Sequence, residues 1–556
     1  MNFAASAYQN HSPRLPLLVL VVLATIYLLA GVTGHDPWKT EDAIHIGIAH
    51  GFLTQGNWLT PYIAGEPWPH TAPLYHWVAA LTGKLLGGLL GFHDAARLAT
   101  TLFGALFLVA LAGAARTFHG DSAGRIAPLL AIGTLGLLLP LHEAQPAVAG
   151  LAFAALAWWG GGLILQGKTR GALLLGLGLG LAFLAHGLAG LVMAIAVLPA
   201  PILLAPHARK PGSLPPTGGL ASSWDGPAPT LRRNWAGLLL ALLIALPLIL
   251  AWPLLLTQQA PEFWFQWWGN EIAEVTAGRG LPEGRHLEQL IWATWPVWPL
   301  ALWSLWLNRR QPDGLALPLL GVLIALVWYL TGSSRTLALL PLIMPLTLVA
   351  AAGADRMRRG VANAFDWFGL MTFTFVAGLI WLGASAQALD WPPRIARNFD
   401  KLAPGHEVHY TIVALAFAAL ISLAWLLSWR LRRASWRGSL RWAAGTTLMW
   451  VLTATLWLSW IDHAKSYRPV AQSLRAALPQ NIDCIERAAG IGASQRASLD
   501  YFSGIRTVAA SRKRQCHWRL TVEAADRSTP AGWVEAWRGG RPSDRKERWY
   551  LDRRAD

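Results

Sequence analysis

Long apolar runs recur between residues 15 and 461 of this chain, with polar connections between them. A helix needs roughly 20 mainly apolar residues to cross a bilayer, and about thirteen runs meet that length rule. The composition agrees, because 54% of the residues are hydrophobic and only 14% are charged. A span in lipid must satisfy its own backbone hydrogen bonds, so such runs form helices. The sequence therefore predicts an all-α polytopic protein surrounded by membrane lipids.

The basic residues indicate how the chain is oriented. The formal net charge is +16, but most Lys and Arg before residue 460 lie in short loops beside apolar runs. There they set topology, so nucleic acid is not an expected partner. The loops on one side carry more Lys and Arg than those on the other. This bias predicts a cytoplasmic tail at residues 1–14, a transmembrane domain at 15–461 and an outward first loop at 35–94.

The last segment, residues 462–556, is polar and contains short β-prone runs beside the helical stretch "SYRPVAQSLRAALP". We expect a small α/β domain that needs to dock on the membrane part to be stable. An odd number of spans places this domain outside the membrane, in the periplasm. It contains both cysteines of the chain, Cys484 and Cys516. An oxidising compartment would permit a disulfide between them, and two unrelated thiols are the alternative.

The first outward loop is unusually long for a connection, which indicates either function or disorder, and its apolar content argues against disorder. Glu41 and Asp42 begin a segment with apolar residues on one helical face, typical of a helix lying flat on the membrane. The proline-rich "GNWLTPYIAGEPWPHTAPLYHW" and a second amphipathic helix, ending near Leu90, follow. Acids at a helix start also complement the helix dipole, so a purely structural role is the alternative for this pair.

This order of elements resembles the C-type (GT-C) glycosyltransferases. It is most similar to the bacterial branch that includes the aminoarabinose transferase of lipid A and the protein O-mannosyltransferases. Those enzymes have an acid pair in the first outward loop, then G-x-W-x-x-P, K-P-P-L-Y-x-W and A-R-L motifs, and later a basic residue before L-L-P-x-x-P. The residues that match are Gly56, Trp58 and Pro61, then Pro73, Leu74, Tyr75 and Trp77, then Ala96, Arg97 and Leu98, and finally Arg335, Pro341 and Pro345.

The resemblance implies an inverting glycosyltransferase of the bacterial cytoplasmic (inner) membrane with its active site on the periplasmic side. It would move a sugar from a polyprenyl-phosphate carrier to a lipid A, glycan or protein acceptor, with no cofactor besides the donor. By position, the catalytic acid of the family falls on Glu41, with Asp42 as its neighbour. A carboxylate can take the proton of an acceptor hydroxyl and orient it for attack. Adjacent helical residues point about 100° apart, so we expect one acid to face the site and the other to organise the loop.

The chain departs from the family where a lysine is expected before the second motif, since Thr71 stands there. His186 stands where the family has a second lysine, between the apolar runs Ala172 to Ala185 and Leu188 to Leu204. The leaving phosphate needs cations or backbone donors. The substrate-binding candidates are His70, Tyr75, Arg97, Glu143, His186, Arg279, Arg285 and Arg335.

Each candidate also has a structural alternative. An arginine can anchor a lipid headgroup or form a loop ion pair, Glu143 can cap a turn, and His186 can be a packed histidine. Arg335 is the favoured cation because it lies in a matched motif. No acidic cluster has the spacing of metal ligands, so no metal is expected.

Two other functions compete with transfer. Loss of both lysines would suit a non-catalytic protein that binds or flips polyprenyl lipids on the same scaffold. A transporter is disfavoured because paired half-chain repeats with broken helices are not evident. The long first outward loop would also have no purpose in a transporter.

Overall fold

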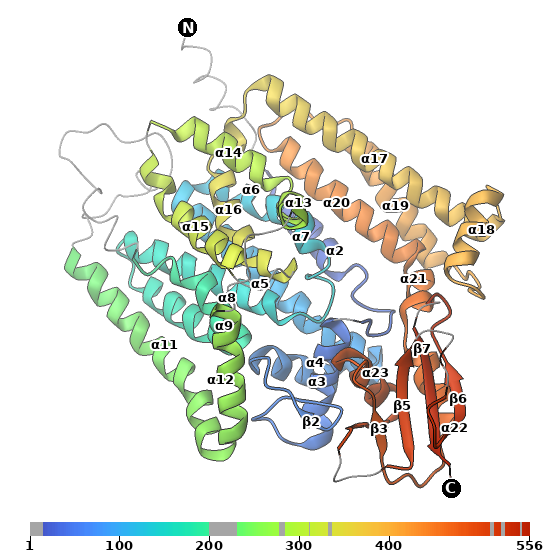
Figure 1. Cartoon of the computed structure of the whole chain (residues 1–556). Coiled ribbons are helices and arrows are strands. Elements are labelled where there is room, and N and C mark those ends of the chain that lie inside the picture. Colours follow the sequence, from blue (N-terminus) through green and yellow to red (C-terminus); the bar gives the residue numbers. More distant parts are fainter. Residues whose placement is uncertain are drawn as a thin grey trace, which may run out of the picture.

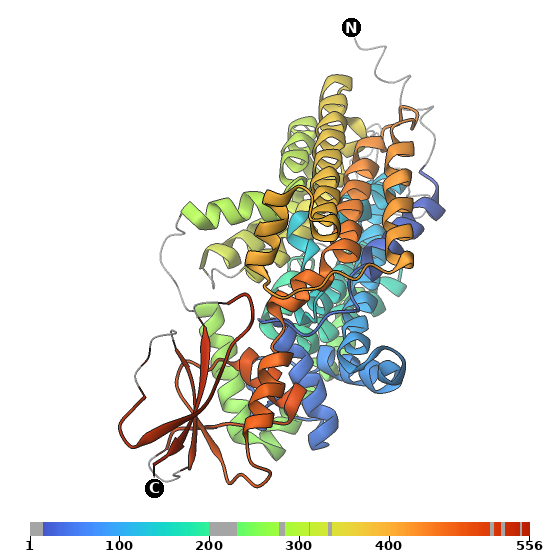
Figure 2. The ribbon, with the colours of Figure 1, turned by 90° about the vertical axis from the view of Figure 1, so that its right-hand side faces the viewer.

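The computed structural model describes residues 15–39, 41–199, 231–276, 284–310, 312–331, 336–511, 516–523, 527, 529–544 and 547–555. Most of these residues are helical. The helices of the membrane part lie side by side, and the C-terminal domain packs against one end of them (Figure 1, Figure 2).

Five helices of the described segments are long and apolar enough to cross a membrane, and two bent helix pairs raise the number to seven. The five are α5 (Phe92–His119), α8 (Pro146–Leu165), α9 (Arg170–Ile195), α11 (Leu231–Gln259) and α17 (Arg359–Leu389). The bent pairs are α13 (Gly284–Ala293) with α14 (Val297–Asn308), at 76°, and α20 (Arg437–Leu456) with α21 (Leu458–Lys465) and α22 (Arg468–Ala477), at 64°. By length alone this is fewer than the roughly thirteen spans that the sequence predicts.

Several predicted spans form helices shorter than a bilayer requires. Three apolar ones are α2 (Leu17–Leu29), α15 (Ala316–Thr331) and α19 (Ile412–Ser428). The other helices of the membrane part are α6 (Asp121–Ile132), α7 (Leu135–Leu138), α12 (Pro261–Thr276), α16 (Leu340–Ala351) and α18 (Pro393–Leu402). An apolar run thus predicts that a segment is helical, but it does not predict where the helix is interrupted.

Glycines let α8 and α9 pack backbone against backbone at the centre of the bundle. A Cβ atom at Gly160 would lie 2.3 Å from the backbone nitrogen of Leu175, and one at Gly178 would lie 2.5 Å from that of Ala157. Helices in lipid associate through such close packing of small residues. The apolar window of α8 is accordingly 89% buried, whereas that of α11 at the edge of the bundle is only 28% buried and leaves its leucines facing outward.

Helix α9 is broken at His186 and Gly187, between the two apolar runs that the sequence predicts. Gly187 has φ = 57°, a conformation that side chains with a Cβ rarely adopt. A Cβ there would lie 2.4 Å from a carboxylate oxygen of Glu271 on α12. That carboxylate accepts a hydrogen bond from the backbone nitrogen of Leu188 at 2.7 Å, so it satisfies an amide that the break frees.

The loop at residues 35–94 folds into α3 (Glu41–Gln55), a short antiparallel hairpin of β1 (Tyr62–Ile63) and β2 (Glu66–Pro67), and α4 (Leu74–Leu90). Both predicted helices are present, and α4 ends at the predicted residue. Gly51 allows the hairpin to approach α3, because a Cβ there would lie 3.0 Å from the carbonyl oxygen of Tyr62.

The C-terminal segment forms a five-stranded mixed sheet in the order β4-β3-β5-β7-β6, with α22 and α23 (Ala493–Ser503). The strands are β3 (Ile485–Arg487), β4 (Val508–Ala509), β5 (Trp518–Glu523), β6 (Trp533–Gly539) and β7 (Arg548–Arg554). Strand β3 is parallel to β4 and β5, whereas β7 is antiparallel to β5 and β6. A disulfide joins Cys484 to Cys516, whose Cα atoms are 5.3 Å apart.

This domain docks on the loop at residues 35–94. Arg487 donates to Glu66 of the hairpin at 2.6 Å. Helix α23 packs on α3 so closely that a Cβ at Gly47 would lie 2.8 Å from the Cβ of Ala497. Arg468 donates to Asp36, just before α3, at 3.0 Å. The C-terminal domain therefore holds the segment that presents the acid pair (Figure 1).

Candidate active site

The two acids at the start of α3 occupy different environments. The Asp42 residue is 1% exposed, whereas 32% of the Glu41 side chain is exposed. Successive side chains on a helix point about 100° apart, which separates the two carboxylates. One acid is thus enclosed and the other borders the surface.

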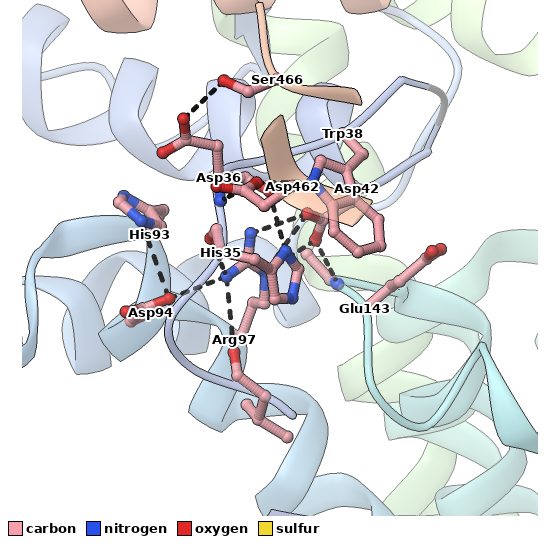
Figure 3. A network of polar contacts seen from close by, with 12 residues as sticks. His35, Asp36, Trp38, Asp42, His93, Asp94, Arg97, Glu143, Asp462 and Ser466 are labelled. Carbon is pink, nitrogen blue, oxygen red and sulfur yellow. Dashed lines mark hydrogen bonds and ion pairs between the residues drawn. The ribbon is translucent and has the colours of Figure 1, made fainter. Parts of the chain in front are cut away.

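Asp42 is locked into a buried ion pair with Arg97 of α5 (Figure 3). The guanidinium approaches the carboxylate with both Nε, at 3.1 Å, and Nη2, at 2.9 Å. The backbone nitrogen of Ala144 donates to the same carboxylate at 2.7 Å. Burial by itself would raise the pKa of Asp42, but the Arg97 charge and these hydrogen bonds lower it below its ordinary value. Asp42 is therefore an ionised acid that ties α3 to α5 and to the loop before α8.

Arg97, a candidate substrate-binding cation by sequence, is fully enclosed. Its remaining Nη1 donates to Asp94 at 2.9 Å and to the carbonyl oxygen of His35 at 2.9 Å (Figure 3). A guanidinium has five N–H donors. The carboxylates of Asp42 and Asp94 and the carbonyl oxygen of His35 accept hydrogen bonds from them. In this structure the buried guanidinium is bound to protein acceptors and holds Asp42 in place.

Glu41 lies beside a pair of hydrogen-bonded histidines that reaches into the protein. One of its carboxylate oxygens lies 3.3 Å from Nε2 of His45, one turn along α3. Nδ1 of His45 lies 3.0 Å from Nε2 of His76 on α4, and Nδ1 of His76 lies 3.2 Å from the carbonyl oxygen of Ala72. Both histidines are buried. Glu41 is thus the partly exposed acid, next to buried histidines, whereas Asp42 is the enclosed one.

Glu143, between α7 and α8, is a third acid of this region. Burial, and next the negative charge of Asp42, raises its pKa to about 7, while the Lys465 charge opposes the shift. Thr100 donates to the backbone carbonyl of Glu143 at 2.8 Å, and the hydroxyls of Thr100 and Tyr75 are also 2.8 Å apart. Tyr75 is fully buried, so its hydroxyl supports this loop and is not exposed to a substrate.

Thr71 and His186, where the sequence resemblance predicts lysines, line one small pocket together. His70 lines it as well, so the structure brings together three residues that the sequence singles out. The remaining lining residues are Ala72, Ala189, Glu271, Glu274 and Trp328. Burial raises the pKa of Glu271 to about 7. In the part of the chain that the structure describes, no Lys or Arg lines this pocket.

The side-chain positions of three predicted substrate-binding arginines are not described. Arg279 and Arg335 lie outside the described residues, and so does the side chain of Arg285 near the start of α13. Across the described ranges, no group of three His, Cys, Asp or Glu side chains could hold a metal ion.

Sequence reasoning missed His45, His76 and Lys465. His45 could have been found from the sequence, because it follows Glu41 by four residues and this spacing puts both on one helix face. His76 and Lys465 have no such signal, because they reach the site from other elements. The ammonium of Lys465, at the end of α21, lies 4.7 Å from the ring centre of Trp38, and its charge acts on Glu143.

Comparisons with known proteins give the same picture. No family model matches the chain. The undecaprenyl phosphate-alpha-4-amino-4-deoxy-L-arabinose arabinosyl transferase of Edwardsiella ictaluri is 26% identical over 77% of this chain and 75% of its own length. The enzyme of the same name from Pseudomonas aeruginosa is 26% identical over 79% of this chain and 74% of its own length.

A solved structure, ArnT from Cupriavidus metallidurans bound to undecaprenyl phosphate, matches with a TM-score of 0.66 and 15% identity. The match covers 96% of this chain and 97% of that one, so the likeness includes both the helical part and the C-terminal domain. The resemblance found in the sequence is thereby confirmed: this chain is similar in sequence and in fold to the aminoarabinose transferases, a branch of the C-type glycosyltransferases.

Proposed function

We propose that this chain is an integral membrane glycosyltransferase. It moves a sugar from a polyprenyl-phosphate carrier to an outer-leaflet acceptor, with inversion at the anomeric carbon. The observation that carries the proposal is the different surroundings of the two acids. Asp42 is held in a buried ion pair, whereas Glu41, at the same helix start, is partly exposed. The similar enzymes from Edwardsiella and Pseudomonas, which are named as transferases, support it.

In the proposed reaction, the carboxylate of Glu41 accepts the proton of an acceptor hydroxyl as the oxygen attacks the anomeric carbon. A bond forms between that carbon and the acceptor oxygen, and the bond to the carrier phosphate breaks. The electron pair leaves with the phosphate, so polyprenyl phosphate is the second product. Asp42 keeps the start of α3 in place, because its partners lie on α5 and on the loop that carries Glu143.

The charge that develops on the leaving phosphate requires donors. Lys465 is our candidate, because it is an exposed cation whose charge reaches Glu143 beside the acid pair. Arg279, Arg285 and Arg335 remain candidates from the sequence. His70 and His186 border the pocket at Thr71 and are proposed to bind substrate through hydrogen bonds.

We place the protein in the bacterial inner membrane with the active site on the periplasmic side. The shorter apolar helices are proposed to complete about thirteen spans between residues 15 and 461. Residues 1–14 are then cytoplasmic, and residues 35–94 and 462–556 are periplasmic. The disulfide of the C-terminal domain fits this assignment, since disulfides persist in oxidising compartments. External labelling of a cysteine introduced at exposed Arg475 in spheroplasts tests it, and protection from the label would reverse the topology.

Activity is tested with purified protein in nanodiscs. The donor is the undecaprenyl-phosphate aminoarabinose that the names of the similar enzymes specify, and lipid A is the acceptor. Release of undecaprenyl phosphate is expected, and Glu41→Gln should lower kcat by about 10²- to 10⁴-fold. Glu262→Gln, at an exposed glutamate on α12, is the matched control.

Full activity of Glu41→Gln would remove Glu41 as the base. No release from this donor or from other polyprenyl-phosphate sugars, together with movement of the lipid between leaflets, would favour the non-catalytic lipid-binding or flipping alternative.

A further inference from the structure

The indole of Trp38 contacts two charged residues of the short helix α21. Its Nε1 donates to the carboxylate of Asp462 at 2.8 Å (Figure 3). The Lys465 ammonium lies over the same side chain, 4.7 Å from the ring centre. Asp462 and Lys465 are three residues apart on α21, so they lie on one face of that helix. One side chain is therefore held at its polar edge by an acid and on its ring by a cation.

The backbone of Trp38 connects this contact to the acid pair. Its carbonyl oxygen accepts a hydrogen bond from the backbone nitrogen of Ala43 at 3.0 Å. Ala43 follows Glu41 and Asp42 in the first turn of α3. Because this hydrogen bond uses the backbone, it remains when the side chain of Trp38 is replaced. Trp38 thus lies between Lys465 and the helix that carries Glu41.

Further contacts hold Trp38 in place. The residue is 8% exposed, and the centre of its ring lies 4.4 Å from that of the His35 ring. Burial, and next the charge of Arg97, lowers the pKa of His35 to about 4, so this ring is neutral at pH 7 and does not repel the ammonium. The backbone nitrogen of Asp36 also donates to Asp462, at 2.9 Å. These contacts fix the indole relative to α21.

A ring face attracts a cation without neutralising it. An aromatic ring has a negative face but no net charge, so it draws an ammonium to a defined position and leaves the positive charge available to an anion. The charges of Lys465 and Glu41 both act on Glu143. The cation and the proposed base therefore lie within electrostatic reach of the same carboxyl group.

We propose that Trp38 is a positioning residue that holds the Lys465 ammonium at a fixed place relative to Glu41. Asp462 orients the indole, and the hydrogen bond from Ala43 ties Trp38 to α3. Trp38 thereby couples the start of the C-terminal domain to the helix that presents the base. This role rests on the proposed function, in which Lys465 binds the leaving phosphate, but the contact between ring and ammonium does not.

The contact can be observed without turnover. Treatment of the full-length protein in nanodiscs with ¹³C-formaldehyde and a hydride reductant converts lysines to dimethyl-lysines, which keep their positive charge. The ring current of an indole shifts the signals of methyl groups over its face upfield, so the Lys465 signal should be displaced from those of other lysines. This displaced signal should be absent in Lys465→Arg, which assigns it, and should lose its displacement in Trp38→Leu.

Lys401→Arg, at an exposed lysine on α18, is the matched control and should keep the displaced signal. A wild-type spectrum in which the Lys465 signal is not displaced would overturn the proposal, whether or not the Trp38 variants fold.

Double-mutant kinetics test the positioning role. Lys465→Met should lower kcat/KM by about 10²- to 10³-fold, the effect of removing a donor to a developing negative charge. Trp38→Leu should lower it by about 10²-fold, the effect of a misplaced group. The double variant should be no slower than Lys465→Met, because Trp38 acts through that ammonium. Losses that multiply would overturn the positioning role, and so would full activity of either single variant.

Trp38→Phe keeps a ring at this position and should retain more activity than Trp38→Leu, so equal losses in these two variants would also count against the role. A displaced Lys465 signal in a protein without transferase activity would instead remove the proposed function and leave the contact standing.

Discussion

Replacing Asp42 by Asn should destabilise the protein far more than replacing Glu41 by Gln. The Asp42 carboxylate accepts from Nε and Nη2 of Arg97, at 3.1 and 2.9 Å, and from the backbone nitrogen of Ala144 at 2.7 Å. An asparagine can still accept from Ala144 through its oxygen, but its amide group then points N–H donors at the guanidinium. Arg97 is 0% exposed, so its charge would lose its main partner without gaining water.

The expected cost of Asp42→Asn is about 3 to 5 kcal/mol, the range for removing one partner of a buried ion pair. Two lost charge-assisted hydrogen bonds, at about 1.5 to 3 kcal/mol each, give about 3 to 6 kcal/mol, which overlaps this range. Glu41→Gln changes a side chain that is one-third exposed, so its cost should stay below about 1 kcal/mol.

The assay is unfolding of the purified protein in detergent, followed by tryptophan fluorescence, with transfer activity measured on the same samples. Asp42→Asn should lower the unfolding midpoint clearly, whereas Glu41→Gln should lower activity alone. The double variant Asp42→Asn with Arg97→Met should recover part of the loss, because it removes the fully buried guanidinium charge that Asp42→Asn leaves without its main partner, although Asp94 then loses its 2.9 Å contact with Arg97. Equal stability of wild type and Asp42→Asn would refute the assignment of Asp42 as the structural acid of the pair.

Two further predictions concern Glu143 and the disulfide. Because burial and the Asp42 charge raise the pKa of Glu143 to about 7, its stabilising contribution is full below the ordinary value of 4.5 and is lost as pH rises through about 7. Thermal unfolding should therefore show Glu143→Gln more stable than wild type at pH 8 and indistinguishable from it near pH 4.5; a difference independent of pH would contradict this. Cys484→Ser opens a bridge between residues 32 positions apart and should cost the C-terminal domain about 3 to 4 kcal/mol. Faster proteolysis of residues 462–556 without reductant would show this loss, and unchanged proteolysis would refute it.

Much of the architecture could be predicted from the sequence because it depends on local patterns. Apolar runs with their own hydrogen bonds must be helices, so the helical membrane part followed from hydropathy. The helices before and after the proline-rich stretch of the first outward loop, and the α/β nature of the C-terminal domain, followed from periodicity and composition. The number of membrane-spanning helices could not be predicted in the same way. Helix α19, for example, is only 17 residues long, and bends divide other apolar runs into two helices.

The candidate site was only partly predictable. The sequence by itself determined that two acids open a helix in a long loop between apolar runs, and that their side chains point in different directions, because helix geometry dictates it. Only the tertiary structure decided which acid is which. Arg97 reaches Asp42 across 55 positions and His76 reaches His45 across 31, contacts that local patterns do not encode. A buried guanidinium neutralises Asp42, whereas Glu41 is partly exposed and lies 3.3 Å from a ring nitrogen of His45, and this difference in surroundings makes Glu41 the proposed base.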